Sequence, residues 1–296
     1  MQERIKKEIN NILYNKHNKL NFLPIDCYQK ALKARYALDK EPSEEYDLIR
    51  DFLLIEENKE PGFSRFGVKF QYLKKEFSKR IKNYKFDKTT LEVMNILSSF
   101  SKNSSMVGGS VRDIILKKKP KDFDFVTDIN YDRIKNIFKE HDFQVKEVGK
   151  QFLVVIVSKN GMDYEIANFR KDGTYKDGRR PESVKIGTIF DDAKRRDFTI
   201  NAIYYNLLSK EIIDPNLEGV FDIENKILKF IGNPEDRIKE DYLRVIRFYR
   251  FISKTKFTPD KRSLKEVRRN FEDAQKKVSS ERFRNEIERI IGLERL

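Results

Sequence analysis

Two short stretches near the middle of the chain constrain its fold and chemistry more than any other part. The first is a glycine pair, Gly108-Gly109, between an apolar dipeptide and a predicted helix, and the second is Asp122-Phe123-Asp124. Glycines let a backbone approach a charged group, and the first N–H groups of a helix bind anions such as phosphate. On a strand, Asp122 and Asp124 point to one side, which suits Mg²⁺, an ion that bridges carboxylates to phosphates. The sequence therefore predicts a metal-dependent phosphoryl site, although an Asp-x-Asp pair alone is typical of a solvated turn.

The composition narrows the partners. The 296 residues include 62 Lys and Arg against 48 Asp and Glu, a net charge of +14. This excess favours a nucleic acid or an anionic membrane surface as partner, although a well-solvated basic protein has the same composition. No run of eighteen apolar residues occurs, and the N-terminus lacks the apolar core of a signal peptide, which argues against a membrane. The single Cys27 forms no internal disulfide, and with only His17 and His141 it completes no zinc site. We therefore expect a reducing, cytoplasmic setting and a metal held by carboxylates.

Residues 1–90 are predicted to form a small helical region divided by prolines. Apolar residues recur at helical spacing in 5–13 and in 48–53. The stretch 63–86 interleaves Lys and Arg with Phe and Tyr, a mixture that can stack on and neutralise single-stranded nucleic acid. The alternative is that these aromatic residues form a helix core and the lysines are solvated, and the sequence leaves both open.

Residues 91–214 mix predicted helices and strands in an α+β domain with a small mixed sheet. Helices are predicted over 91–100, 110–118 and 131–140, a short strand over 106–107, and another over 211–213 before Asp214-Pro215 marks a boundary. Asn160-Gly161, between two apolar runs rich in β-branched residues, indicates a hairpin. Glu165 on its second strand is a candidate third metal ligand or general base, or else an exposed strand residue. The polar segment 169–184 is long enough to be a loop over a site, or a connector.

Four polar residues stand among apolar ones in 191–207: Arg195, Arg196, Asp197 and Asn201. Arginine binds phosphate with two parallel hydrogen bonds, and Asp or Asn can bond a ribose hydroxyl. This segment is therefore a candidate for holding the phosphates and sugar of a nucleotide.

Residues 215–296 are predicted to be helical. On a helix over 234–254, Glu240, Asp241, Arg244 and Arg247 share one face at three-and-four spacing, as in any amphipathic helix with salt-bridged solvent residues. A carboxylate at 241 and a guanidinium at 244 also match the amine and adjacent ring nitrogen of cytosine or adenine, and they mismatch uracil and guanine. Glu240, four residues before Arg244, is placed to hold that guanidinium.

Together these stretches resemble class II of the template-independent RNA nucleotidyltransferases, the family of tRNA CCA-adding enzymes and bacterial poly(A) polymerases. The resemblance spans residues 92–292 and implies a polymerase-β-like head followed by a helical neck. The matching stretches, with 281–286 the weakest, are 108–113, 122–124, 195–202, 240–244 and 281–286. It divides the chain into an N-terminal helical region with a possible RNA-binding role (1–90), a catalytic head (91–214) and a base-recognising neck (215–296).

The resemblance also implies roles for residues. Asp122 and Asp124 would bind two Mg²⁺ ions, with Glu165 the third catalytic carboxylate. The nucleotide-binding set would be Gly108, Gly109, Arg112, Arg195, Arg196, Asp197, Asn201, Glu240, Asp241, Arg244 and Arg247. The segment 169–184 is similar to the flexible loop that these enzymes use in the step to A addition.

The implied activity is addition of CCA, or its terminal A, to the 3′ end of tRNA from CTP and ATP. The alternatives are a poly(A) polymerase acting on another RNA 3′ end, a non-catalytic RNA-binding protein on the same scaffold, and nucleotide transfer to a protein or small molecule. Two departures from the family stand out, because about ninety residues precede the head and the chain stops after the neck. We therefore expect the N-terminal helices to supply part of the RNA grip.

Overall fold

The computed structural model describes residues 63–149, 153–175, 178 and 181–291. The predicted helices in 5–13 and 48–53 lie outside these residues. The chain divides into two compact units, Met1–Glu76 and Phe77–Leu296. The α+β region and the helices after it fall in the second unit, whereas the boundaries at 90 and 214 stay predictions.

A seven-stranded mixed sheet organises the second unit, in the order β3-β4-β5-β2-β1-β8-β9. Its strands are β1 (Ser105–Val107), β2 (Asp124–Thr127), β3 (Gln144–Gly149), β4 (Val154–Lys159), β5 (Met162–Asn168), β8 (Tyr204–Asn206) and β9 (Ile212–Ile213). Only the β2–β5 pair is parallel. The α+β class with a mixed sheet is thus confirmed, and β2 stands at its centre.

The hairpin at Asn160-Gly161 forms as predicted. Lys159 pairs with Met162, so the two residues between them make the turn. Both have positive φ, 54° and 75°, which this tight turn requires and which Asn and Gly adopt most readily. The turn sets the register that brings Glu165 beside Asp124 on the neighbouring parallel strand.

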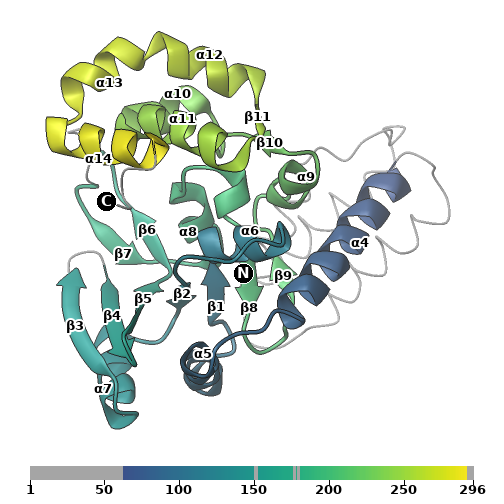
Figure 1. Ribbon diagram of the computed structural model, residues 1–296, viewed down its shortest axis with the longest axis vertical. Helices are drawn as coiled ribbons and strands as arrows, with labels where there is room; N and C mark the ends of the chain where they lie inside the picture. Colours follow the sequence, from purple (N-terminus) through teal and green to yellow (C-terminus); the bar gives the residue numbers. More distant parts are fainter. Residues whose placement is uncertain (1–62, 150–152, 176–177, 179–180, 292–296) are drawn as a thin grey trace, which may run out of the picture. The chain divides into compact units, whose positions relative to one another are not determined.

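Helices cover the sheet and join its strands: α5 (Lys88–Phe100), α6 (Gly109–Ile115), α7 (Tyr131–Glu140) and α8 (Ile189–Arg195). Figure 1 places α5 and α7 near one end of the sheet and the later helices at the other. The bounds predicted for α7 are confirmed, and Asn130 caps it by accepting from the N–H of Asp132. The helix expected over 110–118 ends early at Ile115, because Lys117 turns the chain with a φ of 58°.

The aromatic and basic stretch 63–86 is mostly one helix, α4 (Phe63–Lys82). Phe70 and Phe77 are buried, so the core alternative holds for these two rings. Tyr72 is 61% exposed and Tyr84, beyond the helix end, is partly exposed, so they do not belong to a core.

The segment 169–184 begins with structure of its own. β6 (Arg170–Asp172) pairs antiparallel with β7 (Val184–Ile186), and a bridge joins Tyr175 to Pro181. A two-stranded ribbon therefore leads into and out of the predicted loop.

The last part of the chain is helical apart from a two-stranded parallel pair, β10 (Ile227–Leu228) with β11 (Thr258–Pro259). A 3₁₀ turn, η2 (Thr199–Asn201), precedes it. The helices are α9 (Gly219–Glu224), α10 (Pro234–Glu240), α11 (Leu243–Thr255), α12 (Lys261–Arg269), α13 (Phe271–Lys277) and α14 (Ser280–Ile291).

The prediction of one helix over 234–254 is wrong, because the helix breaks between Glu240 and Leu243. Asp241 is extended, with φ −152° and ψ 105°, and its carboxylate accepts from the N–H of Leu243. Such a side-chain bond to the chain's own backbone competes with helix hydrogen bonds. Asp241 and Arg244 are therefore not on one helical turn, and Asp241 lies at the junction of α10 and α11.

Aromatic side chains of α11 pack against Phe198 and Phe230, which lie outside that helix. Phe198 lies 4.9 Å from Phe230 and 5.0 Å from Phe251 between ring centroids, and Phe230 stacks on Phe248 at 5.4 Å. All four rings are buried. Among the helices of the described residues, none combines the length and apolar character of a membrane span.

Candidate active site

The glycine pair and the carboxylates meet at the start of β2. A Cβ on Gly108 would lie 3.5 Å from Oδ2 of Asp124 and 3.8 Å from Nη1 of Arg196. Gly108 has φ 78° and ψ −135°, a conformation that side chains avoid, so glycine is required there. Asp122 precedes the strand rather than lying on it, and it is exposed, as is Glu165.

The electrostatics of Asp124 test whether these residues fit a divalent cation. Burial, reinforced by the charges of Glu165 and Asp122, raises the pKa of Asp124 to about 7, against the opposing effect of Arg196. The charges of two carboxylates and one guanidinium thus act on Asp124, and hard oxygen donors of this kind fit Mg²⁺. Within the described ranges, no three His, Cys, Asp or Glu side chains are grouped to hold a metal by themselves. The residues therefore fit an ion whose remaining ligands come from water or a substrate's phosphates.

Both predicted phosphate-binding arginines are held by one residue that sequence reasoning missed, Asp192. Its Oδ1 accepts from Nε and Nη2 of Arg195 at 2.9 and 2.5 Å, and its Oδ2 accepts from Nε of Arg196 at 3.0 Å. The hydroxyl of Tyr204 donates to the same Oδ2 at 2.8 Å. Burial raises the pKa of Asp192, yet Arg196 and Arg195 outweigh it and lower the pKa to about 2. A permanently charged carboxylate therefore orients both guanidinium groups.

Asn201 and Asp197, the candidate sugar-binding pair, are hydrogen-bonded to each other. Nδ2 of Asn201 donates to Oδ1 of Asp197 at 3.0 Å, and Arg112 donates to Oδ1 of Asn201 at 2.5 Å. Arg112 is 1% exposed and also binds Asp113, so the structure places it behind Asn201. Its predicted contact with a nucleotide stays a prediction, whereas its contact with Asn201 is direct.

Arg247 connects the sugar-binding pair to the last helix. Its Nη2 and Nε donate to Oδ2 of Asp197 at 2.5 and 3.0 Å. Burial raises the pKa of Asp197, but Arg247 and Asn201 outweigh it and lower the pKa to about 2. Behind Arg247, the buried Glu286 of α14 pairs with Nε of Arg250 at 2.6 Å.

The candidate base-reading residues converge from the broken helix. Nη1 of Arg244 donates to Oε2 of Glu240 at 2.7 Å, the contact that their spacing predicted. The same guanidinium donates to the carbonyl oxygens of Arg237 and Arg195 at 2.8 and 3.0 Å. Asp241 instead accepts from Nη2 of Arg282 at 3.0 Å, a partner that the sequence did not suggest. Arg244 is thus tied to the segment that carries the phosphate-binding arginines.

The segment 169–184 reaches the same place. The carbonyl of Gly178 accepts from the N–H of Tyr242 at 3.4 Å. A pocket of about 550 Å³ lies here, lined by Asp172, Gly173, Thr174, Tyr175, Asp236, Lys239 and Glu240. The ribbon and the base-reading helix therefore face each other across a pocket that one candidate residue, Glu240, helps to line.

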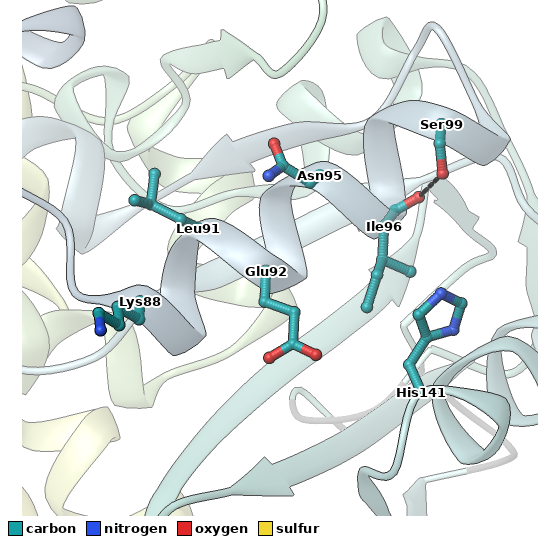
Figure 2. A pocket seen from close by; sticks show the side chains of 7 residues that line it. All are labelled: Lys88, Leu91, Glu92, Asn95, Ile96, Ser99 and His141. Atoms are coloured by element: carbon teal, nitrogen blue, oxygen red, sulfur yellow. Dashed lines mark hydrogen bonds between the residues drawn. The ribbon is translucent and has the colours of Figure 1, made fainter.

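A second pocket, of about 540 Å³, lies along α5 beside the end of α7. Figure 2 shows its lining, with His141 facing the side chains of α5. It contains none of the predicted site residues: the lining is Lys88, Leu91, Glu92, Asn95, Ile96, Ser99 and His141.

Comparison with known proteins fits this geometry. Residues 104–229 match the poly(A) polymerase head domain. The CCA-adding enzyme of Bacillus velezensis is 37% identical over 178 residues, 60% of this chain and 43% of that protein. Over this region the chain is similar to the class II RNA nucleotidyltransferases. The family resemblance predicted from the sequence is thereby confirmed.

Two solved structures of this family share the fold. A CCA-adding enzyme of Bacillus stearothermophilus in complex with CTP is similar with a TM-score of 0.60 and 29% identity, covering 70% of this chain and 49% of that one. A tRNA nucleotidyltransferase complexed with a primer tRNA and an incoming ATP analogue is similar with a TM-score of 0.56 and 26% identity, over 69% and 59% of the two chains. The chain spans about half the length of the curated relatives it matches.

Proposed function

We propose that this chain adds nucleotides without a template to the 3′ end of tRNA, building CCA or its terminal A from CTP and ATP. The observation that carries the proposal is the meeting of Gly108, Asp124 and Arg196 within one small region, with Glu165 on the neighbouring strand. Backbone without a side chain, a carboxylate and a fixed guanidinium are what a triphosphate and its metal need in one place. We propose a cytoplasmic location for this activity.

In the reaction, the RNA 3′-hydroxyl attacks the α-phosphate of the nucleotide and pyrophosphate leaves. Asp122 and Asp124 would hold two Mg²⁺ ions, which stabilise the entering and leaving oxygens of such a displacement. Glu165 adds the third carboxylate. Arg195 and Arg196 bind the phosphates through their guanidinium groups, which Asp192 holds in a fixed orientation.

The sugar and base are read next to this point. Asn201 and Asp197 bond the ribose, and their mutual hydrogen bond orients them. Asp241 and Arg244 read the amine edge of cytosine or adenine, with Glu240 holding the guanidinium. Because Arg282 and two backbone carbonyls engage these groups here, a base must exchange with some of those contacts. The segment 169–184, whose Gly178 contacts Tyr242, is placed to assist that exchange.

The closest alternative is a poly(A) polymerase, and a non-catalytic RNA-binding protein is the alternative of another class. Labelled CTP or ATP offered with tRNAs ending before the first C, before the A, or complete separates them by product size. One to three additions support tRNA end synthesis, a long ladder supports polyadenylation, and no addition favours binding alone.

Asp122→Ala supplies the control for chemistry. We expect incorporation to be lost, because Asp122 is a proposed metal ligand. Thermal unfolding should be unchanged, because Asp122 is exposed. The control is Asp163→Ala, because Asp163 is also exposed and lies on β5, the strand of Glu165; this variant should retain incorporation. Incorporation by the Asp122 variant would refute the assignment of this carboxylate.

A further inference from the structure

Three partly exposed aromatic side chains lie in contact at the start of β2, and the proposed chemistry uses none of them. Tyr84 and Phe86 come from the segment between α4 and α5, and Phe123 stands between Asp122 and Asp124. Ring centroids are 4.9 Å apart for Tyr84 and Phe86, and 5.8 Å apart for Phe86 and Phe123. Phe123 follows Asp122 and precedes Asp124, so this aromatic cluster begins in the stretch that carries both aspartates.

The exposure of these rings sets them apart from the core. Phe77 and Ile81, just before them in the chain, are fully buried. Tyr84, Phe86 and Phe123 are only partly covered, although burying them would be favourable. Their arrangement leaves aromatic surface in solvent at the stretch that carries two proposed catalytic residues.

Exposed lysines flank the aromatic cluster in the chain. Lys82 and Lys85 border Tyr84, and Lys117, Lys118 and Lys119 lead from α6 toward Asp122. The backbone fixes this lysine loop, because the N–H groups of Lys117 and Lys118 donate to the carbonyls of Ile114 and Asp113 at 2.9 and 2.8 Å. Three successive ammonium groups repel one another, and a nearby polyanion relieves that repulsion.

Aromatic faces combined with cations are suited to single-stranded nucleic acid. Bases of an unpaired strand can stack on the rings, whereas the paired bases of a duplex are already stacked on each other. We propose that the aromatic cluster and the lysine loop hold the unpaired 3′ end of the RNA substrate beside Asp122. This rests on the nucleotide addition proposed above, and it gives the segment before the head a direct part in substrate binding.

Binding of RNA to the full chain, measured by fluorescence anisotropy without nucleotide or Mg²⁺, tests the stacking. The probe is an RNA hairpin with a short single-stranded 3′ tail, compared with a blunt hairpin. Phe86→Leu keeps an apolar side chain but removes the aromatic face, so we expect about 5-fold or greater weakening for the tailed RNA only. Phe86→Tyr should bind like the parent, as should Phe100→Ala, which removes a 40% exposed ring on α5.

Replacing Lys117, Lys118 and Lys119 with Ala tests the charges. Three lost phosphate contacts should lower the slope of log affinity against log salt by about 2 for a single strand. The control replaces three exposed neck lysines, Lys261, Lys265 and Lys276.

Four outcomes overturn the proposal: Phe86→Leu binding the tail as tightly as the parent, equal weakening for blunt RNA, equal weakening by Phe86→Tyr, or an equal slope change in the neck control. Thermal unfolding of each variant identifies loss of fold. Because binding is measured without nucleotide, a parent protein that binds the tail but adds nothing would refute nucleotide addition and leave this binding in place.

Discussion

Asp192→Asn is the sharpest test of how Arg195 and Arg196, the proposed phosphate-binding arginines, are held. The carboxylate is fully buried and accepts hydrogen bonds from Arg195, Arg196 and the hydroxyl of Tyr204. Asparagine has the same shape as aspartate, but its NH₂ group would face one of the guanidinium groups. Both groups are hydrogen-bond donors, so that hydrogen bond would be lost. Removing one partner of a buried ion pair costs about 3–5 kcal/mol, because a charge stays buried without compensation.

Two measurements follow from this reasoning. Urea unfolding at pH 7 should give a free energy of unfolding about 3 kcal/mol lower for Asp192→Asn. The KM for ATP and CTP should rise at least 10-fold while the KM for RNA changes little, because Arg196 loses its fixed position beside Gly108.

Asp191→Asn is the matched control on the same helix. Asp191 is the partner of Thr188 in a capping box, and asparagine can still accept those hydrogen bonds, so the cost should be below about 1 kcal/mol. If the two variants unfold alike, Asp192 does not anchor the arginines. If Asp192→Asn is destabilised but its KM for ATP and CTP is unchanged, the contacts of Asp192 with Arg195 and Arg196 stabilise the fold but do not serve nucleotide binding.

Substitutions at Gly108, Asp214 and Arg244 should each have a different effect. Gly108→Ala should abolish incorporation, because side chains avoid its φ of 78° and ψ of −135° and a Cβ would fill the space beside Asp124. Gly161→Ala, with a similar positive φ and open space around it, should cost about 1–2 kcal/mol and keep activity. Burial raises the pKa of Asp214 to about 7, so the protonated carboxyl stabilises the fold at low pH. As the pH rises from 4 to above 7, up to about 4 kcal/mol of the free energy of unfolding should be lost. Urea unfolding of Asp214→Asn should lack this pH-dependent component. Arg244→Ala should relax the preference for C and A over U and G more than it slows addition, measured by competition between the four nucleotides, and an unaltered preference would contradict base reading.

Features set by neighbours in the chain were predictable from the sequence. The hairpin at Asn160-Gly161 and the bounds of α7 follow from turn chemistry and periodicity. The register of the hairpin then placed Glu165 beside Asp124, which the sequence could suggest only as a candidate.

Features set by distant contacts were not predictable in the same way. At the break, Asp241 also pairs with Arg282, forty-one residues later, and the N–H of Tyr242 donates to the carbonyl of Gly178. Asp192 had a local signal, since it precedes Arg195 and Arg196 by three and four positions on a helix, but only burial turns that common spacing into a clamp.

The buried charges also link the later helices to the proposed site. Asn201 is held from the head side by Arg112 and from the other by Asp197, and Asp197 keeps its charge because Arg247 of α11 pairs with it. Packed against the same helix is α14, whose buried Glu286 supplies the negative charge that Arg250 and Arg247 share. Asp197 and Glu286 are each compensated by arginines of α11, so removing α14 would leave arginines of α11 in excess. The groups proposed to read the sugar therefore depend on the last helix of the chain, although they lie in the head.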